Sequence, residues 1–84
     1  MSDWTWDFDP SHIGEGLPSA VRAEVEWVAA ELVFMGADAD NAGRPIDRSG
    51  GLREFPLVHG PGFIKYLVAH HRHEIVIVHV TTLG

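Results

Sequence analysis

The sequence predicts a two-layer α+β domain in which one amphipathic helix covers an antiparallel sheet of about four strands. Three observations predict this fold: an alternating segment near the N-terminus, one helical apolar stripe, and three strand-like segments in the second half. In chain order these elements are β-α-β-β-β. With 84 residues the chain is long enough for one core, and we expect a single domain over residues 1–84.

The first strand is predicted at residues 3–8. Trp4, Trp6 and Phe8 alternate with polar residues there, which is the period of a half-buried strand. The Asp-Pro pair that follows ends the strand, because proline cannot donate a hydrogen bond to a sheet. A short helical turn is expected in the connection at residues 12–16.

One clear helix is predicted from Pro18 to Met35. Proline suits the first helical position, where its missing N–H is not needed, and Gly36 is the expected cap at the other end. Apolar residues recur at steps of four and three, so one side of the helix should cover the sheet. We expect Trp27 and Phe34 to widen or flank this stripe. The stripe consists of Val21, Val25, Val28, Leu32 and Met35.

Residues 37–51 are predicted to form a loop, which is long for so small a domain. Its acidic start hints at a calcium loop, but two ligands of the EF-hand spacing are absent, which favours an ordinary acidic turn. A short third strand is predicted at residues 52–58. Pro56 removes a hydrogen-bond donor from it, so we expect this strand at an edge of the sheet.

A β-hairpin is predicted in the last third of the chain, because two runs rich in β-branched and aromatic residues flank a polar knot. If His71 pairs with Glu74 across a two-residue turn, Tyr66 lies opposite His79. Both faces of the hairpin include apolar residues, so we expect cover on both sides. Its strands are predicted at residues 63–69 and 75–80.

Charge is distributed unevenly along the chain, whose net charge is −6. Residues 1–40 contain nine acidic and one basic side chain, whereas residues 41–84 contain three acidic and five basic ones. The acidic total argues against a nucleic-acid binder, but an anionic ligand would belong on the second half. The chain has no cysteine, which fits a cytoplasmic protein, and no apolar run approaches membrane-span length.

The histidines near the hairpin tip allow two interpretations. His71 and His73 are two residues apart, so they share one side of an extended segment, and His70 or His79 could complete a zinc site. A polar tip with solvated histidines explains the same residues without convergent geometry. We expect neither a metal nor another cofactor.

A candidate site is predicted around the hairpin. Tyr66 and His79 could serve as proton donor and acceptor, with arginines from the neighbouring strand or loop holding a phosphate. The alternative is that Tyr66 packs in the core with its hydroxyl bonded to His79. The cluster comprises Arg53, Glu54, Lys65, Tyr66 and His79.

Three segments of the second half follow a strand, a helix and a loop that contains glycine and arginine. They are LREFPL (52–57), FIKYLV (63–68) and IVIVHV (75–80), and the loop runs into the first of them as GRPIDRSGGLREF (43–55). This pattern resembles the RelE/ParE superfamily of toxins from bacterial toxin–antitoxin modules, including HigB-like and phage-derived members. The resemblance covers nearly the whole chain, although it consists of strand patterns.

The resemblance implies a cytoplasmic toxin that inhibits growth by ribosome-dependent mRNA cleavage. A ParE-type gyrase inhibitor is the alternative. It also implies a cognate antitoxin as partner, which would add a helix over exposed apolar surface or a strand at a sheet edge; a homodimer stays open. Tyr66 matches the tyrosine of the family. His79, Arg53 and Lys65 would supply the remaining catalytic groups, and Arg44 and Arg48 would hold RNA phosphate.

Two positions depart from the pattern of the RNA-cleaving members. Pro56 and Phe63 stand where those members have arginine. A site that cleaves a phosphodiester needs cations to stabilise the developing negative charge, so the losses favour a non-catalytic role. The alternatives are therefore a degenerate antitoxin-binding domain or a small structural and interaction domain.

Overall fold

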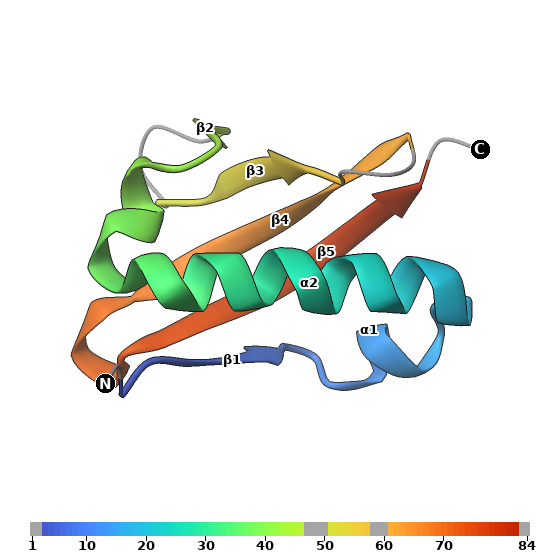
Figure 1. Ribbon diagram of the computed structural model, residues 1–84, viewed down its shortest axis with the longest axis horizontal. Helices are drawn as coiled ribbons and strands as arrows, with labels where there is room; N and C mark the ends of the chain where they lie inside the picture. The colour runs from blue at the N-terminus through green and yellow to red at the C-terminus, as the bar shows by residue number, and fades with distance from the viewer. Residues whose placement is uncertain (1–2, 47–50, 58–60, 83–84) are drawn as a thin grey trace.

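The protein folds into one long helix packed on a five-stranded sheet (Figure 1). The computed structural model describes residues 3–46, 51–57 and 61–82. This arrangement confirms the α+β class with one main helix. The elements are β1 (Thr5–Phe8), α1 (His12–Glu15), α2 (Ser19–Met35), η1 (Gly36–Asn41), β2 (Arg44–Pro45), β3 (Arg53–Pro56), β4 (Gly62–Ala69), η2 (His70–Arg72) and β5 (Glu74–Thr82).

The sheet has the strand order β1-β5-β4-β3-β2 and is mixed, because β1 runs parallel to β5 while the other neighbours are antiparallel. The prediction of about four antiparallel strands was therefore wrong in number and direction. The extra strand, β2, lies in the segment predicted as a loop. The parallel pair arises because the chain between β1 and β2 crosses over the sheet through α2.

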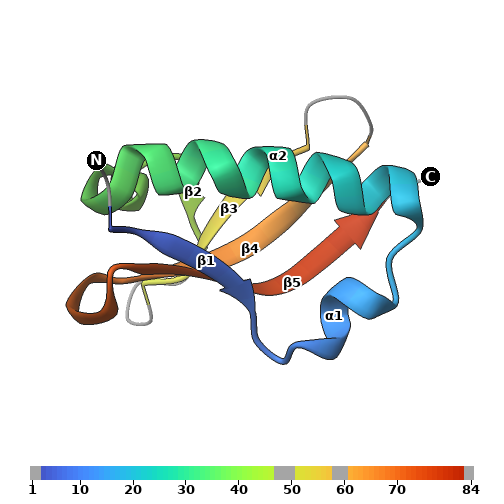
Figure 2. The same cartoon turned by 60° about the horizontal axis from the view of Figure 1, so that its bottom comes forward.

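Helix α2 lies along one side of the sheet and forms the core with it (Figure 2). It begins at Ser19, one residue later than predicted, because Pro18 caps the helix instead of occupying its first turn, and it ends at Met35 as predicted. Gly36 has a φ of 58°, a value that L residues rarely adopt, and the chain continues from it into η1. The sheet residues buried beneath α2 include Ile64, Tyr66, Ile75 and Ile77. Burial of each such side chain contributes roughly 1.5–3 kcal/mol before entropy is subtracted.

The hairpin of β4 and β5 has a longer turn than predicted. Ala69 pairs with Glu74, so four residues connect the strands instead of two, and His73 takes the left-handed conformation. Tyr66 consequently lies opposite Ile77, and its predicted pairing with His79 was wrong. The turn contains no Asn-Gly or Asp-Gly, which are the pairs that favour a two-residue turn.

A register shift in β5 changes which side chains face the helix. Lys65 pairs with His79 and Tyr66 with Ile77, so Val78 is an extra residue on β5. Beyond it the alternation reverses, and Val80 packs against the core while His79 is exposed. Tyr66 and His79 therefore lie on opposite faces of the sheet.

The sheet face away from α2, here called the open face, is not covered by a helix in the described part of the chain. The expectation of cover on both sides was wrong. Strand β3 is not an edge strand, but β2 borders it only at Arg53 and Glu54, which leaves Pro56 beyond that pairing. Within the described residues, no helix is long and apolar enough to cross a membrane. The open face includes Glu54, Pro56, Phe63, Lys65, Leu67, Val76 and His79.

Candidate functional site

A row of ionisable side chains crosses the open face. Glu54 on β3 is the direct partner of Lys65 on β4, and Lys65 is the direct partner of His79 on β5. Because neighbouring strands lie about 4.8 Å apart, the backbones of Glu54 and His79 are separated by roughly 10 Å with Lys65 between them. We call these three residues the cross-strand row. It places a carboxylate, an ammonium group and an imidazole side by side.

Arg44 extends the row onto β2, where it pairs with Glu54. Its Nη2 lies 2.8 Å from Oε1 of Glu54, and its Nε donates to the same oxygen at 3.0 Å. The Arg44 side chain is 77% exposed, whereas that of Glu54 is 15% exposed. The guanidinium group therefore orients the carboxylate, and among the described residues its exposed Nη1 has no other partner.

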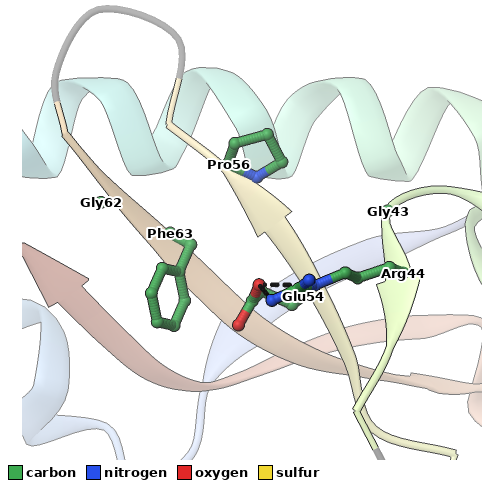
Figure 3. Close-up of a pocket in the computed structure, with 6 residues that line it drawn as sticks. All are labelled: Gly43, Arg44, Glu54, Pro56, Gly62 and Phe63. Atoms are coloured by element: carbon green, nitrogen blue, oxygen red, sulfur yellow. Dashed lines mark hydrogen bonds and ion pairs between the residues drawn. The ribbon is translucent and has the colours of Figure 1, made fainter.

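A depression of about 340 Å³ adjoins the row on the open face (Figure 3). The Phe63 ring lies on one side of it, and the ion pair of Arg44 and Glu54 lies on the other. Nζ of Lys65 is 6.0 Å from the centroid of the Phe63 ring. The depression thus combines apolar walls with charged groups, as small-ligand sites do. Its walls are formed by Gly43, Arg44, Glu54, Pro56, Gly62 and Phe63.

Tyr66 is buried on the opposite face of the sheet, beneath α2. Its hydroxyl lies 2.9 Å from the carbonyl oxygens of both Ala39 and Ala42 and donates its one proton to this pair. Burial raises the pKa of the phenol above its ordinary value of 10.0, although nearby Arg53 opposes that shift. Tyr66 is thus a core residue, as the alternative interpretation expected, but its partners are carbonyls and not His79.

Arg53 lies on the same side as Tyr66 and is also bonded to the backbone. Its Nε donates to the carbonyl of Ala42 at 2.7 Å, and Nη2 donates to that of Gly43 at 3.5 Å. Together the two side chains attach the end of η1 to the sheet. The prediction that Arg53 joins a catalytic cluster with His79 was therefore wrong, because the sheet separates them.

Two histidines of the hairpin tip, His70 and His73, are paired with carboxylates. His70 Nε2 is 3.2 Å from Oδ2 of Asp40, and His73 Nδ1 is 2.6 Å from Oδ2 of Asp3. Trp4 lies against both imidazoles, stacked on His73 and edge-on to His70. The hydrogen bond with His73 lowers the pKa of Asp3 below 3.8. Among the described residues, no group of three or more histidine, aspartate or glutamate side chains could hold a metal.

The structure brings part of the predicted site together. Lys65 and His79 are neighbours on the open face, and Arg44 lies at the other end of the same row. Arg48, predicted to hold RNA phosphate, lies outside the described residues. Glu54 belonged to the predicted cluster but was not assigned a catalytic role. Strict alternation with Arg53 and Phe55 would have placed it on the open face.

Comparison with known proteins gives no match among family models, curated proteins or solved structures. Functional inference therefore rests on the geometry of the open face and on its chemistry.

Proposed function

We propose that this protein is the toxin of a bacterial toxin–antitoxin module and that it cleaves mRNA, with the ribosome as the place of cleavage. The observation that supports this proposal is the cross-strand row of Glu54, Lys65 and His79 on an uncovered sheet face. The proposed catalytic set differs from that predicted from sequence, because Tyr66 and Arg53 serve the core instead.

The three side chains suit the transfer of a phosphoryl group within RNA. The Glu54 carboxylate takes the proton of the ribose 2′-hydroxyl, whose oxygen attacks the adjacent phosphorus. Lys65, together with the exposed guanidinium group of Arg44, stabilises the negative charge that develops on the phosphate oxygens. His79 in its protonated form gives a proton to the departing 5′-oxygen. The products are a 2′,3′-cyclic phosphate and a 5′-hydroxyl.

The depression beside the row would hold a base next to the phosphate that reacts. Phe63 offers an aromatic surface there, and bases of unpaired RNA commonly stack on such rings. Phe63 stands where the RNA-cleaving members of the RelE/ParE superfamily have arginine, so this position would contribute stacking in place of charge. A single-stranded substrate follows, because paired bases could not enter.

The distribution of charge is compatible with an RNA substrate on this face. Arg44, Lys65 and His79 lie together in one half of the open face, whereas Asp7 and Glu74 lie in the half nearer the hairpin tip. The overall charge of −6 nevertheless opposes binding of free RNA. Recognition of mRNA held by the ribosome, where other contacts add to affinity, fits this balance better.

A non-catalytic role is the second candidate, either as a ParE-type gyrase inhibitor or as a degenerate antitoxin-binding domain. The observation that favours it is that Arg44 already forms an ion pair with one carboxylate oxygen of Glu54, the proposed base. The absence of arginine at Pro56 and Phe63 points the same way. A small structural or interaction domain is the remaining alternative.

Induced expression in a bacterium separates these roles, with growth, translation and mRNA integrity followed together. We expect growth arrest, a rapid translation block and fragmented mRNA. Changing Glu54→Gln should lower the cleavage rate about 100- to 10,000-fold, since the base is lost while the shape is kept. Arrest with continuing translation and damaged DNA would indicate gyrase inhibition. Absence of arrest would contradict both toxin roles.

A further inference from the structure

The outer side of α2, turned away from the sheet, has a second apolar stripe. Trp27 is 52% exposed and Phe34 is 85% exposed, so the expectation that they flank the core stripe was wrong. All members of this outer stripe are exposed, and they recur at steps of three, four, three and four. The outer stripe consists of Ala20, Ala23, Trp27, Ala30 and Phe34.

This spacing is that of the a and d positions of a heptad repeat, which form the seam between two packed helices. With Ala20 at a, Trp27 and Phe34 fall at later a positions, and the remaining alanines fall at d. The alanines allow a second backbone to approach closely, while the two aromatic rings supply large side chains for its surface. The 17 residues of α2 extend over roughly 25 Å, enough for a seam of more than two heptads.

Glutamates border this seam on both sides. Glu24 and Glu31 occupy the e positions, and Glu26 occupies a g position. Arg22 is paired with Glu26 at 3.3 Å, but one oxygen of Glu24 is buried without a hydrogen-bond partner among the described residues. The border of the outer stripe is therefore predominantly negative.

The charges at the border indicate which helix fits the outer stripe. A second copy of this chain would bring Glu26 against Glu31 in a parallel pair and like glutamates against each other in an antiparallel one. Such contacts between like charges are unfavourable. Lysine or arginine at the corresponding positions of another helix would instead form ion pairs with Glu24 and Glu31 and would share Glu26 with Arg22.

We propose that the outer stripe of α2 is a docking surface for an amphipathic helix of another protein, with lysine or arginine beside its apolar seam. The inference does not depend on the proposed RNA cleavage. Helix α2 lies on one side of the sheet (Figure 2), and the residues of its outer stripe are exposed, whereas the open face is the other side of the sheet. Binding at α2 would leave the cross-strand row accessible.

Two synthetic peptides of about three heptads test this inference. Both have leucine at a and alanine at d, and they differ only in having lysine or glutamate at every e and g position. Titration calorimetry with the full chain should show binding of the lysine peptide about tenfold tighter than that of the glutamate peptide. Equal affinity, or no binding of the lysine peptide, would overturn the proposal.

Matched variants locate the binding surface. Trp27→Ala combined with Phe34→Ala should weaken binding of the lysine peptide at least about thirtyfold, because exposed aromatics dominate such contacts. Ile46→Ala is the control, since it removes another exposed apolar side chain far along the chain, and it should leave affinity unchanged. Sedimentation of the wild-type chain alone should show no dimer that depends on Trp27 and Phe34, so the wild type and the double variant should have the same oligomeric state. Such a dimer would contradict the argument from charge.

Discussion

Tyr66 illustrates how one residue can be mistaken for a catalytic group. It is the largest of the fully buried side chains, and its hydroxyl serves two carbonyls at the end of η1. A tyrosine held in this way contributes to stability and to the position of η1, not to proton transfer. The sequence pattern alone could not distinguish the two roles, because both need a tyrosine in a strand.

Tyr66→Phe should lower the free energy of unfolding by about 1–2 kcal/mol, because the carbonyl of Ala39 loses its hydrogen bond in a buried setting. Ala42 keeps the donor from Arg53 and should be less affected. Urea unfolding of the variant and the wild type gives the difference. Unchanged stability would mean that the hydroxyl is not bonded as described.

Asp3 should make stability sensitive to acid. The hydrogen bond with His73 lowers the pKa of Asp3 in the folded state below its ordinary value of 3.8. The stability that this carboxylate contributes is therefore fully present above pH 3.8, and it is lost as the pH falls through the lower pKa of the folded state. The wild type should therefore exceed Asp3→Asn in stability near neutral pH, and the difference should shrink below pH 3.8. Urea unfolding at a series of pH values measures it.

Glu15→Gln is the control for this effect, because it removes an exposed carboxylate far from the hairpin tip. Its difference from the wild type should not follow the acid profile of Asp3→Asn. A difference for Asp3→Asn that stays constant down to acid pH would contradict the role given to the pair of Asp3 and His73.

At the scale of elements, the sequence predicted what local patterns determine. The limits of α2 follow from its apolar stripe, Pro18 and Gly36, and the strands of the hairpin follow from their β-branched residues. The hairpin register was not predictable in this way, because an extra residue at Val78 reverses the alternation. The one local sign of this extra residue is that the core residues Ile77 and Val80 are three positions apart instead of two.

The remaining errors concern contacts between distant segments. Strand β2 has only two residues, and it forms because its neighbour β3 offers a free edge. The parallel direction of β1 depends on where the crossover through α2 returns the chain. Neither property is encoded in a local repeat, so sequence periodicity could not show them.

Gly43 should be the most demanding position of the β2 segment. Its φ is 63°, and an added Cβ would collide with the carbonyl oxygen of Glu54. Gly43→Ala adds both a positive-φ strain and this collision. It should therefore destabilise the protein by at least about 2 kcal/mol more than an alanine substitution at a glycine where only the positive φ is unfavourable. Gly51→Ala is that control, because its φ is 69° and no atom of the described residues lies within 4 Å of an added Cβ. Equal losses in thermal unfolding would show that β2 shifts freely away from β3.

The whole molecule presents two different surfaces on opposite sides. The open face of the sheet holds ionisable side chains and a depression, whereas the outer stripe of α2 is apolar with an acidic border. Under the two proposals, RNA would bind at the open face and a partner helix at the outer stripe, so the two would not compete for one surface. In a toxin–antitoxin pair, an antitoxin helix bound at the outer stripe would not cover the cross-strand row. It would block that row only if another part of the antitoxin extended around the sheet edge.

The location of the chemistry is tested most directly by comparing mRNA cleavage by His79→Asn and Tyr66→Phe after induced expression, with the fold of each variant checked by circular dichroism. His79 lies on the open face and Tyr66 lies beneath the helix. We expect His79→Asn to abolish cleavage, because the proton donor is lost, and Tyr66→Phe to retain it. Loss of cleavage in a folded Tyr66→Phe protein, with His79→Asn still active, would contradict the assignment of the site to the open face.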